Sequence, residues 1–186
     1  NIGDSWHSDA TFLPEPPMGS ILYAREIPPF GGDTLFANLS LAYEMLTDGM
    51  RRMLSNLQAV HSDAFLTRGN EERNSTRSTK LKAGAMSAKE TLHPVVRTHP
   101  ETGRKCLFIN EPFTVRFEGM SAEESRPLLD YLLAHIKKPE FTCRFRWQVN
   151  SIAFWDNRCT HHYALNDYHG YRRDMHRVTV NGDRPF

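Results

Sequence analysis

The sequence predicts a mainly β fold with inserted helices, in which an antiparallel sheet closes on itself as a jelly roll. Segments with strand character and helical segments do not alternate along the chain as parallel βαβ units would. Residues 141–149 alternate large apolar side chains with polar ones, which is typical of a strand with one buried face. Such a barrel has an open mouth where side chains from distant strands can converge.

Composition narrows the class of protein. A length of 186 residues with 39% hydrophobic residues fits a single domain over residues 1–186. The formal net charge of +1 gives no reason to expect a nucleic-acid or membrane partner. No apolar run approaches the roughly 18 residues of a transmembrane helix. The three cysteines lie far apart without Cys-x-x-Cys spacing, so a reducing, cytoplasmic compartment is expected.

The first part of the chain is expected to form short strands and then a helix. The expected strands are residues 6–12, 20–27 and 34–37. A proline-rich loop and a Gly-containing turn at residues 28–33 separate them. Apolar side chains at helical spacing in residues 39–57 predict a helix whose Met and Leu side chains belong to the core. Asn38 or Ser40 can cap this helix, and Gly49 suggests a break within it.

The middle of the chain changes character. Residues 67–91 are rich in charged and small polar side chains, which predicts a mobile loop or a poorly packed helix. Residues 93–99 and 104–109 flank a Gly-containing turn and predict a hairpin. His93 and His99 are expected to be ordinary strand histidines, because the sequence offers them no carboxylate partner at ligand spacing.

The last part of the chain predicts one long helix followed by strands. Ser121 and Glu124 have the spacing of a capping box, and an apolar stripe follows them as far as residue 136. Lys137-Lys138-Pro139 is expected to end this helix. The expected strands that follow are residues 141–149, 152–155 and 177–180.

A His-x-Asp pair, His7 and Asp9, together with the distant His162, suggests a metal site. Side chains alternate along a strand, so the first two would point to one side of it. Two histidines and one carboxylate occupy one face of an octahedral metal and leave the other positions open, as in non-haem Fe(II) oxygenases. Arg173 and Arg177 follow and share a face, whether helical or extended, so they suit two anionic groups.

Several separated segments resemble one family, the taurine dioxygenase (TauD/TfdA) family of Fe(II)- and 2-oxoglutarate-dependent dioxygenases. These segments are WHSDATF, PPFGGDTLFAN, HPVVRTHPETGRK and WDNRCTHHYALNDYHGYRRDMHRVTVNGD. The resemblance runs from about residue 4 to the end. It implies a double-stranded β-helix, a cupin-like jelly roll. Because members of the family carry a substantial segment before their His-x-Asp pair, we expect this chain to lack such an N-terminal segment.

The resemblance also implies roles for individual residues. It implies three iron ligands, which are His7, Asp9 and His162. The family pattern at the second motif is Thr-x-His, so His161 occupies the variable place. Thr34 and Arg173 would hold the distal carboxylate of 2-oxoglutarate, and Arg177 would face the acidic group of the substrate. Phe113 would line the substrate pocket, although core packing is the alternative for an aromatic residue there.

The implied activity is hydroxylation of a small anionic organic substrate with O₂ and 2-oxoglutarate, releasing succinate and CO₂. The substrate classes are alkylsulfonates such as taurine, alkyl sulfates and aryloxyalkanoates. Residues 67–91 would form a lid or a plain solvated surface. Two other functions stay open, a metal-dependent hydrolase that activates water on Zn²⁺ and a non-catalytic cupin-like binding module. The first leaves the arginine pair without a role, and the intact ligand set argues against the second. A homo-oligomer also stays open.

Overall fold

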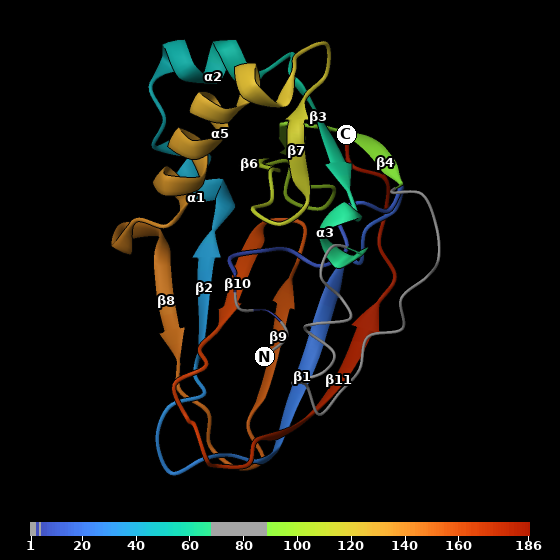
Figure 1. Ribbon diagram of the computed structural model, residues 1–186. Coiled ribbons are helices and arrows are strands. Elements are labelled where there is room, and N and C mark those ends of the chain that lie inside the picture. The colour runs from blue at the N-terminus through green and yellow to red at the C-terminus, as the bar shows by residue number, and fades with distance from the viewer. Residues whose placement is uncertain (1–2, 4, 68–88) are drawn as a thin grey trace.

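The computed structural model describes residues 3, 5–67 and 89–186. Antiparallel strands make up most of the regular structure in these residues. Figure 1 shows the longer strands standing along the long axis of the molecule, with helices α1, α2 and α5 gathered at one end.

Six of these strands form two antiparallel sheets within the described residues. One sheet has the order β11-β1-β9, with bounds Asp174–Val180, Gly19–Glu26 and Ile152–Asp156. The other has the order β10-β2-β8, with bounds Thr160–Ala164, Thr34–Asn38 and Thr142–Phe145. The chain changes sheet between β1 and β2, between β8 and β9, between β9 and β10 and between β10 and β11. This strand exchange is typical of a jelly roll.

Apolar side chains of the two sheets pack against one another. The buried members of this shared core are Ala24, Trp147, Ala153 and Trp155. Phe36 from β2 and Phe145 from β8 pack on the same cluster as Leu22 from β1 and Met175 from β11. The rings of Phe36 and Trp155 have their centroids 5.5 Å apart. The sheets therefore face each other across this core, which confirms the predicted jelly roll.

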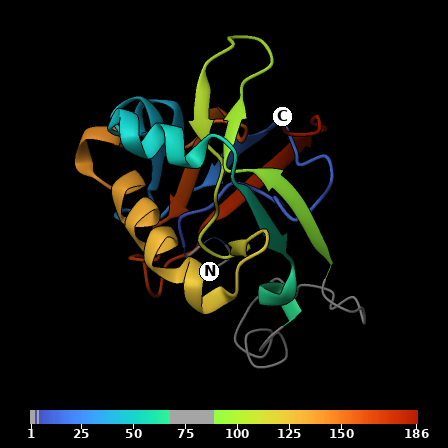
Figure 2. The ribbon, with the colours of Figure 1, turned by 90° about the horizontal axis from the view of Figure 1, so that it is seen from above.

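A second core lies at the end where the helices gather. The helices are α1 (Leu39–Glu44), α2 (Asp48–Leu54), α3 (Ala64–Thr67), α5 (Ala122–Ile136) and the 3-10 helix η1 (Pro139–Phe141). The strands are β3 (Gln58–Ser62), β4 (Glu90–Pro94), β5 (Val96–Thr98), β6 (Lys105–Leu107) and β7 (Thr114–Phe117). They pair as β4-β3-β7 and as the hairpin β5-β6. Seen from above in Figure 2, α5 in gold and α2 in cyan lie on the side away from green β4. Buried side chains from these helices and from these strands fill this second core.

The start of α5 confirms the predicted capping box. Ser121 Oγ accepts a hydrogen bond from the Glu124 N–H at 3.1 Å, and Glu124 Oε2 accepts one from the Ser121 N–H at 2.8 Å. Both bonds satisfy helix-terminal donors that would otherwise have no partner. The buried stripe of this helix includes Leu129, Leu132 and Ile136, as its periodicity predicted.

The predicted strand at residues 6–12 is wrong. His7 forms a single bridge to His162, and the chain then turns, with Ala10 in the left-handed region at φ 46°. Asp9 therefore lies in a turn, and the alternation of side chains along a strand is not what brings it to the same side as His7. Their proximity has to come from the contacts of this turn.

The predicted helix at residues 39–57 is two helices. Asn38 caps α1 as predicted, because its Oδ1 accepts from the Leu41 N–H at 2.9 Å. The break falls at residues 45–47 and not at Gly49, because Thr47 begins a new helix by accepting from the Met50 N–H. The prediction that Met53 belongs to the core is also wrong, since Met53 is 49% exposed, whereas Met50 packs against the core as predicted.

Two further strand boundaries differ from the prediction. β8 ends at Phe145, although the alternation continues to residue 149, because its partner β2 begins at Thr34 opposite Phe145. The last strand begins at Asp174, three residues before the predicted start. A strand ends where its hydrogen-bonding partner ends, and a pattern within one segment does not contain that information.

The predicted hairpin around residues 100–103 is confirmed for residues 96–98 and 105–107, but not for the start of its first strand. Residues 93–99 divide into β4 and β5, which belong to different sheets, and β5 pairs with β6. β4 begins at Glu90, inside the segment predicted to be a loop. Most of that segment, residues 68–88, lies outside the described residues.

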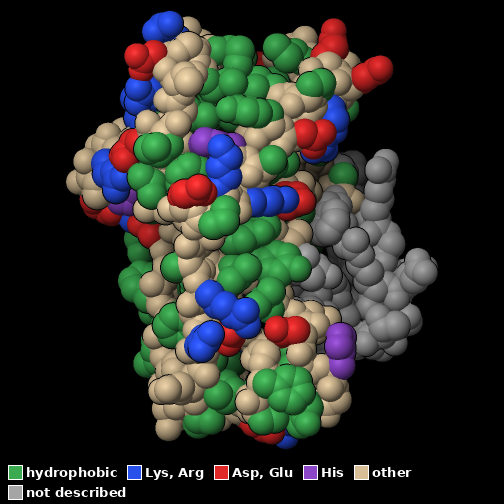
Figure 3. Space-filling model, turned by 90° about the vertical axis from the view of Figure 1, so that its left-hand side faces the viewer, with side chains coloured by type: hydrophobic (Ala, Val, Ile, Leu, Met, Phe, Trp, Pro, Cys, Tyr) green, Lys and Arg blue, Asp and Glu red, His purple; other side chains and the backbone are tan. Residues whose placement is uncertain are grey.

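The surface in Figure 3 carries basic and acidic side chains interspersed with apolar ones. This is the face over the left-hand side of Figure 1, and neither sign of charge dominates it. None of the helices in the described ranges has the length and apolar character that crossing a membrane requires.

Candidate active site

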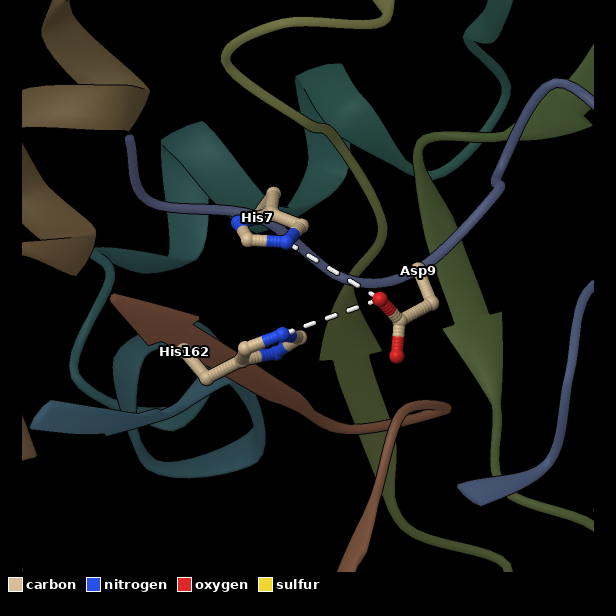
Figure 4. A group of neighbouring side chains, drawn as sticks. All are labelled: His7, Asp9 and His162. Atoms are coloured by element: carbon tan, nitrogen blue, oxygen red, sulfur yellow. Dashed lines mark ion pairs between the residues drawn. The ribbon is translucent and has the colours of Figure 1, made fainter. Parts of the chain in front are cut away.

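The structure brings together three of the predicted residues. His7 is bridged to His162 on β10, and Asp9 lies in the turn that follows His7. Backbone hydrogen bonds in both directions join His7 and His162, at 3.1 Å and 2.7 Å, and set their rings side by side with centroids 4.1 Å apart. Asp9 Oδ1 lies 3.8 Å from His7 Nε2 and 3.7 Å from His162 Nε2. Figure 4 shows the three side chains pointing toward one common space, and their ligand atoms all lie within 4.8 Å of one another.

The protonation of these groups suits metal binding. His7 Nδ1 donates to the Ser5 carbonyl at 2.7 Å, and the other ring nitrogen, Nε2, faces Asp9. Burial lowers the pKa of His162 well below its ordinary value, so its ring is neutral. Burial alone would raise the pKa of Asp9, but the hydrogen bond and positive charge of Arg177 outweigh it and hold that pKa well below its usual range. The cluster therefore offers two imidazoles and one carboxylate, the donor types of a metal site.

Arg177 lies directly beside this cluster. It is on β11, and its Nη2 contacts Asp9 Oδ2 and Ser20 Oγ. Its guanidinium carbon lies 5.8 Å from the ring centroid of Trp155. The side chain is 40% exposed, whereas that of Asp9 is only 12% exposed. Arg177 therefore contacts the Asp9 carboxylate with one edge and keeps another part of its surface toward solvent.

Arg173 and Thr34 lie together in a second polar cluster. Arg173 Nε donates to the Gly32 carbonyl at 3.0 Å, and its guanidinium lies 5.9 Å from the ring centroid of Trp147. Trp147 Nε1 in turn donates to Thr34 Oγ1 at 3.0 Å, so the Thr34 hydroxyl keeps its own proton for another acceptor. Thr34 and Trp147 are buried.

The guanidinium of Arg173 has unused hydrogen-bonding capacity. Its Nη2 is buried and has no hydrogen-bond partner among the residues that the structure describes. Burial also lowers the pKa of Arg173, as desolvation does for a cation. A buried donor of this kind is unfavourable unless an anion satisfies it. The cluster of Arg173, Thr34 and Trp147 therefore fits a carboxylate group.

Two other predicted residues, His161 and Phe113, have clear positions. His161 is buried and its Nε2 hydrogen-bonds the Ile109 carbonyl at 2.8 Å, on the side of β10 opposite to His162. Phe113 is 6% exposed and packs edge-on against Phe12 with centroids 5.1 Å apart. This places Phe113 against the loop that carries Asp9, and its contact with substrate stays a prediction.

His99 has the carboxylate partner that the sequence did not reveal. Its Nε2 lies 3.0 Å from Asp156 Oδ2, and Cys159 completes a second grouping of ligand types. Arg158 Nε and Nη2, however, bind both oxygens of Asp156 at 2.6–3.2 Å. These contacts form an ion-pair network, with Glu101 as a further acceptor for Arg158. His93, by contrast, contacts the Leu13 carbonyl at 3.0 Å, as an ordinary buried histidine does.

Several contributors to the site were missed in the sequence. They are Ser20, Gly32, Trp147 and Asn157. Each acts through a contact with a residue more than ten positions away, so spacing could not identify it. Gly32 and Asn157 lie within segments that carry the family resemblance, which was the one sequence signal for them, whereas Ser20 and Trp147 lie outside those segments.

Comparison with known proteins agrees with this arrangement. The family "Taurine catabolism dioxygenase TauD, TfdA family" matches residues 1–179. An alkylsulfatase of Acinetobacter baylyi is 40% identical over 97% of this chain and 57% of its own length. An alpha-ketoglutarate-dependent sulfate ester dioxygenase of Pseudomonas putida is 38% identical over 98% of this chain and 61% of its own length. The chain thus spans about three-fifths of the length of these curated relatives.

Solved structures resemble the chain as closely. A taurine dioxygenase from Burkholderia xenovorans superposes with a TM-score of 0.80 at 38% identity, covering 97% of this chain and 57% of that one. AAD-2 in complex with Mn(II) and N-oxalylglycine gives a TM-score of 0.83 at 33% identity, covering 98% of this chain and 70% of that one. The fold is the cupin-like double-stranded β-helix of such enzymes, and the chain belongs to the TauD/TfdA family.

Proposed function

We propose that this protein is an Fe(II)- and 2-oxoglutarate-dependent dioxygenase that hydroxylates a small anionic organic substrate. The observation that supports this most directly is a combination of two clusters. A two-histidine, one-carboxylate group occurs together with a buried threonine and an arginine whose buried Nη2 has no partner among the described residues. A metal and a dicarboxylate co-substrate require such a combination. Relatives named as alpha-ketoglutarate-dependent dioxygenases agree with it.

His7, Asp9 and His162 would hold the iron. Their imidazole nitrogens and carboxylate oxygen match the donor set of non-haem Fe(II) oxygenases, which leaves positions for co-substrate and O₂. The chemistry that Fe(II) supplies at such a site is oxidation of a substrate C–H bond by O₂, coupled to decarboxylation of 2-oxoglutarate to succinate and CO₂. The protein contributes two ring nitrogens and a carboxylate that is held by hydrogen bonds.

Arg173 and Thr34 would bind the distal carboxylate of 2-oxoglutarate. The Arg173 Nε is already held by Gly32, which fixes the plane of the guanidinium and leaves Nη2 for the ligand. The Thr34 hydroxyl accepts from Trp147 and can donate to the same carboxylate. A charge-assisted bond in this buried place favours an anion strongly over a neutral group.

Arg177 would recognise the acidic group of the substrate. Its partial exposure and its place beside Asp9 would set that group next to the metal, where a neighbouring C–H bond can react. Sulfonates, sulfate esters and aryloxyalkanoates are the substrate classes we propose, and they match what the relatives' names state for those proteins. Hydroxylation of the carbon next to the ester oxygen would release sulfate, so cleavage of an alkyl sulfate needs no hydrolytic mechanism.

The cellular setting that we propose is the cytoplasm. The three cysteines are free in the structure, with one of them buried, and free thiols suit a reducing compartment. A homo-oligomer and the identity of the substrate within these classes stay predictions.

A succinate-release screen tests this proposal. We would incubate the purified protein with Fe(II), O₂, 2-oxoglutarate and each of taurine, an alkyl sulfate and a phenoxyalkanoate. We expect at least one anionic substrate to raise succinate formation, and His7→Ala to abolish it while His161→Ala keeps it. Cleavage of the alkyl sulfate that needs neither 2-oxoglutarate nor O₂ would support the metal-hydrolase alternative instead.

A further inference from the structure

We infer that Ser20 and Asn157 are positioning residues that hold Asp9 so that only its Oδ1 faces the metal. This inference rests on the proposed metal site. It concerns the orientation of a ligand rather than its identity, and it gives a function to two buried side chains that have no other part in the chemistry.

The two oxygens of Asp9 have different surroundings. Oδ1 faces the Nε2 atoms of His7 and His162. Oδ2 accepts a hydrogen bond from Ser20 Oγ at 3.1 Å and one from Asn157 Nδ2 at 3.1 Å. Arg177 Nη2 also contacts Oδ2. The carboxylate therefore has one edge directed to the histidines and one edge occupied by donors.

The amide of Asn157 is itself fixed. Asn157 is 2% exposed and lies in the turn between β9 and β10. Its Oδ1 accepts from Trp155 Nε1 at 2.9 Å, so the amide nitrogen must be the atom that faces Asp9. Its backbone N–H donates to the Met18 carbonyl at 2.8 Å. Both ends of the residue are thus tied to buried neighbours.

Ser20 provides a second support from a different element. It lies on β1, is fully buried, and receives hydrogen bonds from Arg177 Nε and Nη2 while donating to Asp9. β1 is the central strand of its sheet, paired on both sides. The Ser20 hydroxyl therefore has little freedom to follow a moving carboxylate.

Asp9 requires this support because its backbone is not in a strand. It lies in a turn whose next residue, Ala10, has positive φ, so sheet pairing does not fix the direction of its side chain. A carboxylate that rotates can bind a metal through both oxygens and use a position that co-substrates need. Donors on Oδ2 favour binding through Oδ1 alone, in the way that outer hydrogen bonds orient metal ligands generally.

Arg177 differs from Ser20 and Asn157 in its exposure, and this difference separates their roles. Arg177 is 40% exposed and is the proposed partner of the substrate anion, so its contact with Asp9 is the one that a substrate would compete for. Ser20 and Asn157 are buried and stay on Oδ2 when that happens. They keep the ligand orientation constant through substrate binding.

The test is the affinity of the purified protein for Mn(II) alone, measured by calorimetry, with variants Asn157→Leu and Ser20→Ala. Asn157→Leu keeps the approximate volume and removes the donor. We expect both variants to bind Mn(II) about 10- to 100-fold more weakly, as the loss of such outer contacts does elsewhere. The matched control is His135→Leu on α5, which removes a buried hydrogen bond to the Ala42 carbonyl on α1, away from the cluster. This control should lower the melting temperature and leave Mn(II) affinity unchanged.

A second readout is specific to ligand orientation. With Mn(II) bound, a carboxylate free to use both oxygens would compete with a bidentate ligand, so N-oxalylglycine should bind both variants more weakly than wild type. Wild-type affinity for Mn(II) and N-oxalylglycine in folded Ser20→Ala and Asn157→Leu would overturn the inference and leave the proposed function standing. If Asn157→Leu does not fold, Ser20→Ala decides. Mn(II) binding that is equally tight in wild type and His7→Ala would instead refute the metal site itself.

Discussion

Arg173 and Arg177 are four residues apart on one edge of the molecule, yet their surroundings differ. Arg173 is fixed by the Gly32 carbonyl and has a buried donor without a partner in the described part of the chain. Arg177 is partly exposed and contacts Asp9. The residue pattern alone placed both arginines on one face and did not distinguish their surroundings. The structure gives each a separate surrounding, and the two variants below separate the roles we propose for them.

Arg173→Ala should raise the apparent KM for 2-oxoglutarate by about tenfold or more. Removing a charge-assisted bond of this kind costs about 1.5–3 kcal/mol, and about 1.4 kcal/mol corresponds to one decade. The KM for the anionic substrate should change much less. Steady-state succinate formation at varied concentrations of each compound measures both values. Equal effects on the two compounds would contradict the role of Arg173.

Arg177→Ala should impair the use of the anionic substrate and leave substrate-independent decarboxylation of 2-oxoglutarate intact. Asp9 would still be held by Ser20 and Asn157, so the metal site should persist. Arg177→Lys should also be poor, since an ammonium group cannot make the two-pronged contact of a guanidinium. Succinate formation with and without substrate separates the two reactions. Loss of the substrate-independent reaction in Arg177→Ala would mean that Arg177 serves the co-substrate or the fold.

At the scale of elements, the turn between β1 and β2 determines where Arg173 lies. Gly31 and Gly32 have φ values of 72° and 70°, which L-residues with side chains rarely adopt. The Gly32 N–H donates to Asp167 Oδ1 at 2.7 Å, and the Gly32 carbonyl accepts from Arg173. A Cβ on Gly31 would lie 2.5 Å from Asp167 Oδ1. The turn therefore links Asp167 to Arg173 through the backbone N–H and carbonyl of a single residue, Gly32.

Gly32→Ala should weaken 2-oxoglutarate binding through Arg173. An added Cβ would lie 3.1 Å from Arg173 Cδ and 3.2 Å from its Nε, so the guanidinium must shift. The matched control is Gly103→Ala, which has a similar φ of 67° but meets nothing described within 4 Å. Both variants should lose about 1–3 kcal/mol of stability from the backbone conformation. Only Gly32→Ala should raise the KM for 2-oxoglutarate. A matching rise in Gly103→Ala would mean that lower stability explains the effect.

At the scale of the whole molecule, buried histidines tie stability to pH. His61 is fully buried between β4 and β7, close to His93, and burial lowers its pKa to about 3 from an ordinary value of 6.5. The folded state keeps this ring neutral, whereas the unfolded chain protonates it below pH 6.5. Stability that depends on His61 is therefore complete above pH 6.5 and falls as the pH decreases toward 3.

Urea unfolding at pH 7 and pH 5 measures this dependence. His61 alone should lower the free energy of unfolding by about 2 kcal/mol between these values, since one pKa unit corresponds to about 1.4 kcal/mol. His61→Phe should be less stable at pH 7, because it loses the contact with Thr11 Oγ1, and should show a smaller decrease at pH 5. His169→Asn, at an exposed position, should keep the wild-type pH dependence. An unchanged pH dependence in His61→Phe would contradict the account.

Features that depend on neighbouring residues in the sequence were predicted well. The capping box of Ser121 and Glu124 and the cap at Asn38 are local, and the structure confirms them. Strand limits were predicted less well, because β8 ends where its partner β2 begins. The split between β4 and β5 has the same cause, since each pairs with a different part of the chain.

In the candidate site, too, the local features were predicted and the contacts between distant residues were not. The ligand types and the two arginines follow from the sequence segments, and the structure brings His7, Asp9 and His162 together. The reason we gave for the first pair was wrong, because Asp9 lies in a turn and is directed by hydrogen bonds from distant residues. Such contacts arise only after the chain folds, so neither periodicity nor spacing predicts them.

The central claim is that metal, 2-oxoglutarate and anionic substrate react together in this one site. The most direct measurement is simultaneous recording of O₂ consumption and succinate formation by the Fe(II)-loaded protein, with an alkyl sulfate as substrate. We predict equal amounts of O₂ consumed and succinate formed, with sulfate released in step, and no reaction when either O₂ or 2-oxoglutarate is omitted. Sulfate released at the full rate under anaerobic conditions without 2-oxoglutarate would contradict the account.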